Sequence, residues 1–183
     1  MRVITGSAKG RKLKAVPGES TRPITDRVKE ALFDILGTNV RQARMLDLFG
    51  GTGSVGIEAL SRGAREVIFV DKARLALETI RHNLETTQLS ERARVVRGDA
   101  FDYLKGPPAS FEYIYVAPPQ HKGLWLAALR ALDLQPGWLA SDGEIIVQIH
   151  PAEFRSIELQ HFEPVDERKY GSTLLIFYAH RER

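Results

Sequence analysis

Three aspartates stand at or just past the ends of three consecutive apolar segments, and a run of glycines follows the first of them. Asp47 lies in RMLDLF, Asp71 ends EVIFVD, and Asp99 follows ARVVRG. The glycine-rich run GGTGSVG occupies residues 50–56. Carboxylates collected at one edge of a parallel sheet can bind amine and hydroxyl groups of a small ligand, and glycines let that ligand approach the backbone. The pattern therefore predicts a cofactor site.

The glycines alone do not identify the cofactor. Residues 51–56 fit the Gly-x-Gly-x-x-Gly pattern of a dinucleotide site, in which a pyrophosphate lies on a helix N-terminus. Asp47, four residues before Gly51, would repel a pyrophosphate. It would suit a ligand that carries a cationic amine or sulfonium and no phosphate. We therefore expect such a cation in this site rather than NAD.

The two later aspartates also have a simpler interpretation, because Asp71 and Asp99 could each cap the following helix. Three acids at three successive strand ends are harder to obtain by chance, since those ends share one edge of the sheet. The length points the same way. A chain of 183 residues leaves little room for the second, substrate-binding domain that a dehydrogenase usually needs.

A second candidate site lies where the fourth apolar segment ends in Ala117-Pro118-Pro119-Gln120. Adjacent prolines fix φ and remove two N–H donors, so the carbonyl oxygens of Ala117 and Pro118 can face a ligand. Rigid acceptors can orient an exocyclic amine and localise its lone pair for an in-line displacement, which depends on positioning and electrostatics. The alternative interpretation is an ordinary Pro-Pro turn that closes a strand. We take these four residues as the catalytic candidates.

Alternating strand and helix patterns supply the framework for both sites. Apolar runs such as EVIFV and EIIVQI suit a sheet that is covered on both faces. The alternation predicts an α/β fold with a mostly parallel, doubly wound sheet and an antiparallel last strand. We expect strands at 43–49, 66–71, 93–99, 111–117, 143–149 and 172–180, helices at 26–36, 54–63, 73–87, 101–104 and 123–132, and a less regular stretch before the last strand.

The helix expected at 26–36 has both a predicted cap and a predicted apolar face. Thr25 or Asp26 is expected to cap it. Its predicted apolar face consists of Val28, Leu32, Ile35 and Leu36.

Basic side chains are concentrated at the start of the chain. The first thirty residues carry eight basic and three acidic side chains, although the net charge of the whole chain is only +3. This asymmetry predicts a polyanion as partner, and the alternative is a solvated tail. Residues 1–22 are expected to form a basic extension, either a short hairpin or a loop, ahead of one domain at 23–183. We expect phosphate contacts from Lys9, Arg11, Lys12 and Lys14. Arg22 and Arg27 are expected to lie nearer the active cleft.

Composition and hydropathy exclude several kinds of protein. The chain has no Cys, so it can form neither a disulfide nor a cysteine zinc site. The N-terminus lacks the apolar core of a signal peptide, and the apolar stretch LWLAALRALDLQPGWLA is interrupted by charges and a proline. We therefore expect a cytoplasmic protein without membrane contact, and a monomer. The scattered histidines show no metal-ligand spacing, so no metal is expected: His82, His150, His161 and His180.

The string Asp-x-Phe-x-Gly-x-Gly at residues 47–53 resembles the first motif of Rossmann-like, class I methyltransferases. That resemblance implies S-adenosylmethionine as the cofactor. It also implies that Asp71 binds the ribose hydroxyls, that Asp99 accepts a hydrogen bond from the adenine amine, and that Phe101 packs on the adenine face. The implied cofactor-binding residues are Asp47, Phe49, Gly51, Gly53, Asp71, Lys72, Asp99, Ala100 and Phe101.

Three longer segments, RVITGSAKGRKLKAVPG, TRPITDRVKEALFDIL and LDLFGGTGSVGIEALSRGA, together resemble the RsmD-type 16S ribosomal RNA guanine-N2 methyltransferases in order and spacing. The resemblance covers nearly the whole chain. It implies action on the guanine N2 amine of small-subunit (16S) ribosomal RNA, within a small-subunit assembly particle. It further implies that the basic extension grips RNA and that TRPITDR lies over the cofactor.

One site departs from the pattern of amino-methyltransferases. Those enzymes have Asn or Asp, then Pro-Pro, then Tyr or Phe, whereas this chain has Ala117 and Gln120 at the two flanks. The change removes a side-chain acceptor and a surface for base stacking. His121 and Trp125 are candidates to replace the stacking surface. Each could equally be a packing or surface residue, since Trp125 falls on a helix whose apolar face includes Leu124 and Leu129.

Three other functions stay open. An amino-methyltransferase of this kind could act on a protein glutamine or on a small molecule, which the basic extension argues against because neither is a polyanion. The chain could be a non-catalytic RNA-binding module on the same fold. A dinucleotide enzyme is the third alternative, and Asp47 argues against it.

Overall fold

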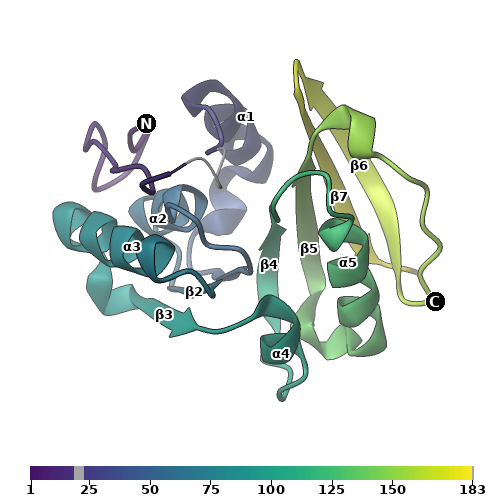
Figure 1. The fold of residues 1–183 in the computed structure, drawn as a ribbon. Helices are drawn as coiled ribbons and strands as arrows, with labels where there is room; N and C mark the ends of the chain where they lie inside the picture. Colours follow the sequence, from purple (N-terminus) through teal and green to yellow (C-terminus); the bar gives the residue numbers. More distant parts are fainter. Residues whose placement is uncertain (19–22, 183) are drawn as a thin grey trace.

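The computed structural model describes residues 1–18 and 23–182, which form a seven-stranded sheet with helices on both faces (Figure 1). The order across the sheet is β3-β2-β1-β4-β5-β7-β6. β1 to β5 are parallel, and β7 is antiparallel to β5 and to β6. This confirms the predicted doubly wound sheet. The strands are β1 (Arg44–Asp47), β2 (Glu66–Asp71), β3 (Ala93–Arg97), β4 (Phe111–Val116), β5 (Leu139–Ile149), β6 (Phe162–Tyr170) and β7 (Thr173–His180).

The helices follow the predicted alternation with strands. They are α1 (Asp26–Leu36), α2 (Ser54–Ser61), α3 (Arg74–Thr87), α4 (Ala100–Leu104) and α5 (Leu124–Leu134), with 3₁₀ turns η1 (Gly37–Val40), η2 (Ser90–Arg92), η3 (Pro136–Trp138) and η4 (Pro151–Glu153). Thr25 caps α1, because its Oγ1 accepts a hydrogen bond from the Val28 amide at 3.3 Å. The predicted face of α1 was wrong at Ile35, which is 36% exposed, whereas Phe33 is buried.

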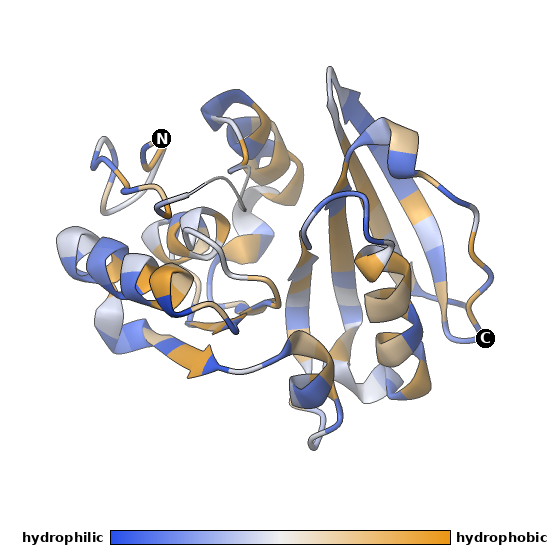
Figure 2. Ribbon diagram, viewed as in Figure 1, coloured by the Kyte–Doolittle hydropathy of each residue, from blue (hydrophilic) through white to orange (hydrophobic). Residues whose placement is uncertain are grey.

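Two hydrophobic layers cover the sheet. One layer packs α1, α2 and α3 on one face, and the other packs α4 and α5 on the opposite face. Successive strand residues alternate between them, as in β4, where Tyr113 and Tyr115 join the first layer and Ile114 and Val116 the second. Much of α5 and part of β5 are coloured as hydrophobic (Figure 2).

β6 is a strand that the sequence pattern did not predict, since its residues were expected to be irregular. The segment FEPVDERKY lacks a regular apolar alternation, and it is largely hydrophilic (Figure 2). β6 pairs only on one side, with β7, so it is an edge strand. Pro164 and a register shift between Pro164 and Asp166 are features that edge strands tolerate and central strands do not.

The N-terminal segment, defined here as residues 1–14, folds back on itself and packs against the domain. Arg2 and Lys12 form an antiparallel bridge, and the Val3 amide donates to the Arg11 carbonyl at 2.9 Å. Three of its apolar side chains, Val3, Ala8 and Leu13, are buried with α1, α2 and α3. The domain boundary predicted between residues 22 and 23 adjoins residues outside the described ranges, so it stays a prediction.

None of the helices in the described part of the chain has the length and apolar character needed to cross a membrane.

Candidate functional site

The three aspartates meet at one edge of the sheet. β2 lies between β1 and β3 and pairs in parallel with both. Asp47 is the last residue of β1, Asp71 is the last residue of β2, and Asp99 lies two residues beyond β3. Parallel strands end at the same edge, so the carboxylates and the loop between β1 and α2 lie close together, as predicted.

The loop between β1 and α2 needs glycine for two different reasons. Gly53 has a φ of 77° at the N-cap of α2, a left-handed conformation that L side chains rarely adopt. Gly56 has ordinary helical geometry, but a Cβ there would lie 2.3 Å from the Phe69 ring, so glycine lets α2 pack directly on β2. These constraints bring the α2 N-terminus close to the strand ends and leave the backbone of the loop open to a ligand.

Asp47 is a buried carboxylate that the fold leaves incompletely paired. Its side chain is 1% exposed, and its Oδ1 has no hydrogen-bond partner among the described residues. Burial and the nearby charge of Asp71 raise the pKa of Asp47 well above its ordinary value, and the backbone amide of Gly56 opposes them. Burial, with a smaller contribution from Asp47, also raises the pKa of Tyr115. A buried oxygen without a partner favours a ligand with a positive donor.

Asp71 has two structural contacts in addition to its predicted role. One oxygen accepts from the Gly51 amide at 2.9 Å, and the other accepts from the Ala73 amide at 2.9 Å. The carboxylate therefore fixes the glycine loop and the start of α3. Each oxygen keeps a second lone pair for a ligand hydroxyl. The neighbouring Lys72 side chain is exposed.

Asp99 caps α4, which was the simpler interpretation of this residue. Its Oδ1 accepts from the amides of Phe101 and Asp102, at 2.8 and 3.3 Å. The cap leaves Oδ2 without a hydrogen bond to the described residues, so capping and ligand binding are compatible. Phe49 and Phe101 meet edge to face with ring centroids 6.3 Å apart, and both are partly exposed. Ala100 is buried beside them.

The turn Ala117–Gln120 follows β4, which lies beside β1 in the sheet. Ala117 is half-buried, Pro118 is buried and Pro119 is exposed. The carbonyl oxygens of Ala117 and Pro118 accept no hydrogen bond from the described residues, so they are free to act as acceptors, as the sequence predicted. Trp125 does not supply a stacking surface, because this residue of α5 is 1% exposed and packs in the hydrophobic layer between the helix and the sheet. His121 is exposed and remains a candidate.

Asn83 connects the N-terminal segment to the glycine loop. Its Oδ1 accepts from the Lys14 amide at 2.8 Å, and its Nδ2 donates to the carbonyls of Lys14 and Thr52 at 3.0 and 2.9 Å. The side chain is fully buried. The Asn83 side-chain amide therefore ties the end of the N-terminal segment to the loop between β1 and α2, beside the strand ends that carry the aspartates.

Lys29 and Glu58 make a second connection between the same two parts. The Lys29 Nζ donates to the Arg2 carbonyl at 2.6 Å and to the Ser54 Oγ at 2.9 Å. Glu58 accepts from the amides of Ile4 and Thr5 and lies 3.7 Å from Nζ. Both side chains are fully buried. Burial lowers the pKa of Lys29, and the charge of Glu58 opposes that shift.

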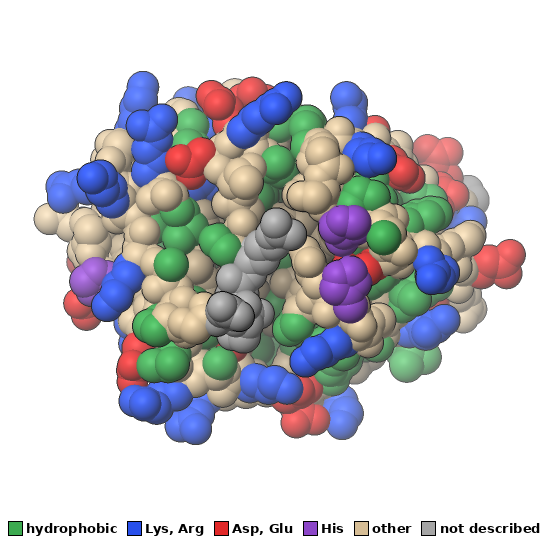
Figure 3. Space-filling model, turned by 45° about the horizontal axis from the view of Figure 1, so that its top comes forward, with side chains coloured by type: hydrophobic (Ala, Val, Ile, Leu, Met, Phe, Trp, Pro, Cys, Tyr) green, Lys and Arg blue, Asp and Glu red, His purple; other side chains and the backbone are tan. Residues whose placement is uncertain are grey.

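The basic side chains of the N-terminal segment point outward from this anchored backbone. Those of Lys9, Arg11, Lys12 and Lys14 are exposed, and so is Arg27 at the start of α1. In Figure 3, Lys and Arg side chains gather at the left end of the molecule, where Figure 1 places the N-terminal segment. Arg22 lies outside the described residues, so its predicted position near the cleft stays a prediction.

Sequence reasoning missed four residues whose side chains connect distant segments near the site or lie beside such a contact: Lys29, Asn83, His150 and Glu153. Lys29 and Asn83 interrupt apolar helix faces with a polar side chain, and this was an available signal that each has a buried partner. His150 and Glu153 gave no such signal. Glu153 accepts a hydrogen bond from the His121 amide, 32 positions earlier in the chain, and no local pattern predicts that contact.

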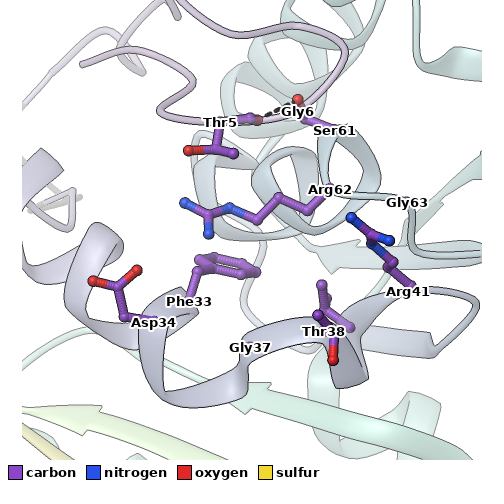
Figure 4. Close-up of a pocket in the computed structure, with 11 residues that line it drawn as sticks. Thr5, Gly6, Phe33, Asp34, Gly37, Thr38, Arg41, Ser61, Arg62 and Gly63 are labelled. Carbon is purple, nitrogen blue, oxygen red and sulfur yellow. Dashed lines mark hydrogen bonds between the residues drawn. The ribbon is translucent and has the colours of Figure 1, made fainter.

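A hollow of about 720 Å³, which none of the three aspartates lines, is bordered by residues such as Phe33, Arg41 and Arg62 (Figure 4). It is formed where α1 and α2 end. The Arg62 guanidinium lies over the Phe33 ring, 4.9 Å from its centroid, and its Nε donates to Glu58 at 2.9 Å. The arginine is thus satisfied within the protein, and the carboxyl ends of two helices disfavour an anionic ligand here. No predicted site residue lines this hollow.

The chain is similar to known proteins in both sequence and structure. A family model described as "Conserved hypothetical protein 95" matches residues 1–179. "Putative rRNA methyltransferase YlbH" of Bacillus subtilis (strain 168) is 43% identical over 188 residues, covering 99% of this chain and 100% of that protein. "Ribosomal RNA small subunit methyltransferase D" of Escherichia coli (strain K12) is 35% identical over 148 residues, covering 81% of this chain and 74% of that protein.

A solved structure from Escherichia coli, titled "Putative methyltransferase yhhF", superposes with a TM-score of 0.87 at 31% identity. The match covers 98% of this chain and 97% of that chain. Its extent means that the whole fold is shared, including the N-terminal segment and the β6–β7 pair.

Proposed function

Because the chain belongs to the RsmD-type family of ribosomal RNA methyltransferases, we propose that it transfers a methyl group from S-adenosylmethionine to the exocyclic N2 amine of a guanine in small-subunit (16S) ribosomal RNA. The guanine, its N2 atom and the donor are the specific parts of the proposal. The substrate form is an assembly particle of the small subunit, and the enzyme acts as a cytoplasmic monomer.

The observation that carries the proposal is the unpaired oxygen of Asp47. S-adenosylmethionine supplies an electrophilic methyl group on a sulfonium centre and also carries an ammonium group. Asp47 is a buried anion beside a loop that glycines keep open, so it suits a cationic ligand and opposes a pyrophosphate. Asp71 and Asp99 keep lone pairs for hydroxyl and amine donors, and Phe49 and Phe101 offer apolar surface to an adenine.

The Ala117–Gln120 turn supports an amine as the group that receives the methyl. The free carbonyl oxygens of Ala117 and Pro118 accept the two N–H bonds of an exocyclic amine. These bonds hold the nitrogen in place and localise its lone pair toward the bound methyl donor. The acceptors belong to the backbone, so they survive the replacement of the usual Asn or Asp by alanine. Gln120 offers an amide oxygen as a further acceptor.

The N-terminal segment supports RNA as the substrate. Its exposed Lys and Arg side chains stand on a backbone that buried residues hold rigidly against α2 and α3. Cations fixed in this way neutralise phosphates without first having to order a flexible tail. This arrangement disfavours a protein glutamine or a small molecule as substrate, since neither carries a row of phosphates.

The missing acid at position 117 favours one competing function, a binding module that has lost its chemistry. The test starts with calorimetry, in which we expect S-adenosylmethionine and S-adenosylhomocysteine to bind and NAD not to bind. Asp71→Ala should weaken that binding by about 1–3 kcal/mol, through lost ribose contacts and a looser Gly51 amide.

The second step uses small subunits from a strain that lacks the enzyme. They are incubated with labelled S-adenosylmethionine, and the methylated nucleoside is located by mass spectrometry. N2-methylguanosine in 16S RNA is the expected product. Methylation of a different nucleoside would refute the guanine assignment. Cofactor binding without transfer to any small-subunit particle would favour the binding module.

A further inference from the structure

A small pocket adjoins the Ala117–Gln120 turn on the side away from the aspartates. β4 and β5 are parallel neighbours, so the turn after β4 and the residues after β5 meet at the same edge of the sheet as Asp47. The pocket has a volume of about 370 Å³. Its lining residues are His121, Gly123, Trp125, Leu126, Ala152, Glu153 and Arg155.

One carboxylate joins the two loops that form this pocket. Glu153 accepts a hydrogen bond from the His121 amide at 2.7 Å through one oxygen, and from the His150 amide at 3.3 Å through the other. His121 has a φ of 64°, in the left-handed region that few residues other than glycine occupy, although histidine is among those that adopt it more often. A strained residue persists only when its surroundings hold it, and such residues cluster at ligand sites.

The rings of His121 and His150, whose backbone amides Glu153 binds, lie side by side. Their centroids are 6.0 Å apart and their planes are tilted by 45°. A pair of adjacent histidine side chains is exposed on the face drawn in Figure 3. The His150 Nδ1 accepts from the Ala152 amide at 3.0 Å, so a neutral His150 ring carries its proton on Nε2, where it can donate to a ligand. Below the rings, Trp125 and Phe154 stack with centroids 6.5 Å apart.

The chemistry of the pocket selects its ligand. Two exposed basic residues belong to the same loops: Lys122 follows His121 in the sequence, and Arg155 lines the pocket, with its guanidinium donating to the carbonyls of Ala152 and Phe154 at 3.4 and 2.7 Å. Among residues 1–18 and 23–182, no group of three or more acidic, histidine or cysteine side chains could hold a metal ion. Glu153 already uses both oxygens to bind amides. Flat rings with a hydrogen-bond donor, next to two cations, are complementary to a planar base that carries a phosphate.

We propose that His121 and His150, held in place by Glu153, bind the nucleotide of the RNA that carries the target amine. The base lies against the imidazole rings, with its phosphate near Lys122 and Arg155. His121 directly follows the catalytic turn, so a base held there presents its edge to the carbonyls of Ala117 and Pro118. The inference rests on the proposed function for the identity of the base, a guanine. Glu153 is a positioning residue, since it acts through the two histidines.

The first test detects the base directly and needs no methyl transfer. The full-length protein, bound to S-adenosylhomocysteine, is titrated with guanosine 5′-monophosphate while the ring protons of its five histidines are followed by nuclear magnetic resonance. Single histidine variants assign the signals. Ring-current shifts are expected at His121 and His150, whereas His82, His161 and His180 serve as internal controls. Equal shifts at all five histidines, or none at His121 and His150, would overturn the proposal.

The second test separates this inference from the proposed function. On small-subunit particles, His121→Ala should lower kcat/KM about 10- to 100-fold, as expected for the loss of one base stack, mainly through KM. His121→Phe should restore most of it, because a phenyl ring keeps the stacking surface. Affinity for S-adenosylhomocysteine should stay unchanged in both. The control, His82→Ala, alters an exposed residue of α3 and should keep full activity.

The remaining outcomes are distinct. Glu153→Gln places an N–H group against an amide donor, so it should lower kcat/KM while both rings remain present. An active parent whose His121→Ala variant keeps its KM would overturn this inference and leave the proposed function standing. An inactive parent that still shows the two histidine shifts would overturn the proposed function and leave the nucleotide site standing.

Discussion

Replacing Asp47 by asparagine should change stability and cofactor affinity in opposite directions. The substitution keeps the size and shape of the side chain and removes only its charge. In the free protein that charge is buried, lies near Asp71, and has one oxygen without a partner. An ordinary buried polar substitution weakens the fold, whereas Asp47→Asn should stabilise the free protein.

The sizes of the two effects follow from the same oxygen. A buried polar atom without a partner costs about 1–3 kcal/mol, and an amide at this site still bears part of that cost. We expect a gain in unfolding free energy of about 1 kcal/mol, which raises the melting temperature by about 2–4 °C in a chain of this length. Loss of a charge-assisted hydrogen bond to the cofactor costs about 1.5–3 kcal/mol, or roughly 10- to 100-fold in affinity.

The pH dependence supplies an independent check of the sign. The pKa of Asp47 is raised above its ordinary value of 3.8, so the folded protein binds this proton more tightly than the unfolded chain does. This carboxyl therefore lowers stability as the pH rises from about 3.8 through the raised pKa, and its full cost is present above that pKa. Asp47→Asn should remove this loss, so the gain in stability should be larger at neutral pH than in acid.

The assay combines scanning calorimetry of the free protein with titration calorimetry of S-adenosylhomocysteine. Asp34→Asn is the matched control, because Asp34 is exposed on α1 and should change neither quantity. If Asp47→Asn destabilises the free protein and leaves the affinity for S-adenosylhomocysteine intact, the unpaired oxygen does not face the cofactor and the reasoning is refuted.

Three further variants test other parts of the structure. Asn83→Ala removes three hydrogen bonds made by a buried side chain, so unfolding free energy should fall by about 2–4 kcal/mol and affinity for S-adenosylhomocysteine should also fall; urea unfolding and calorimetry, with the exposed Asn39→Ala as control, measure both. Pro118→Ala should reduce methyl transfer more than cofactor binding, because it loosens the turn and leaves the glycine loop alone, while Ala117→Asp should leave transfer level or raise it; a binding module would instead gain transfer only with the aspartate. The last variant removes four basic side chains of the N-terminal segment, those of Lys9, Arg11, Lys12 and Lys14. It should weaken RNA binding across sequences and flatten the salt dependence of that binding without changing cofactor affinity. An unchanged salt slope would mean that these side chains do not contact phosphates.

The edge of the sheet where the three aspartates meet could be predicted from the sequence, because it depends on local patterns. Each aspartate follows a recognisable strand, and parallel strands bring their ends together whatever the rest of the chain does. For Trp125 the sequence left stacking and packing open, and the structure shows that it packs in the core with Ala128, Leu129 and Leu132, which follow it at helical spacing.

The arrangement of the residues that follow β4 and β5 could not be predicted in the same way. The contact between Glu153 and His121 joins the end of the η4 turn to a loop residue 32 positions earlier, and no periodicity encodes it. β6 was missed for a related physical reason. An edge strand has one unpaired side and many charges, so its sequence resembles that of a loop.

The anchoring of the N-terminal segment has a consequence for how the chain folds. Lys14 is bonded to a residue 69 positions later, and Ile4 to one 54 positions later, so the part of the protein that is synthesised first has its partners in helices made afterwards. Contacts of such long range carry a large loop-closure cost and form late. The segment should therefore be absent from the folding transition state, and variants that weaken its anchors should speed unfolding while leaving the refolding rate nearly unchanged. The unfolding rate of the native protein would then be set largely by the contacts that form last during folding.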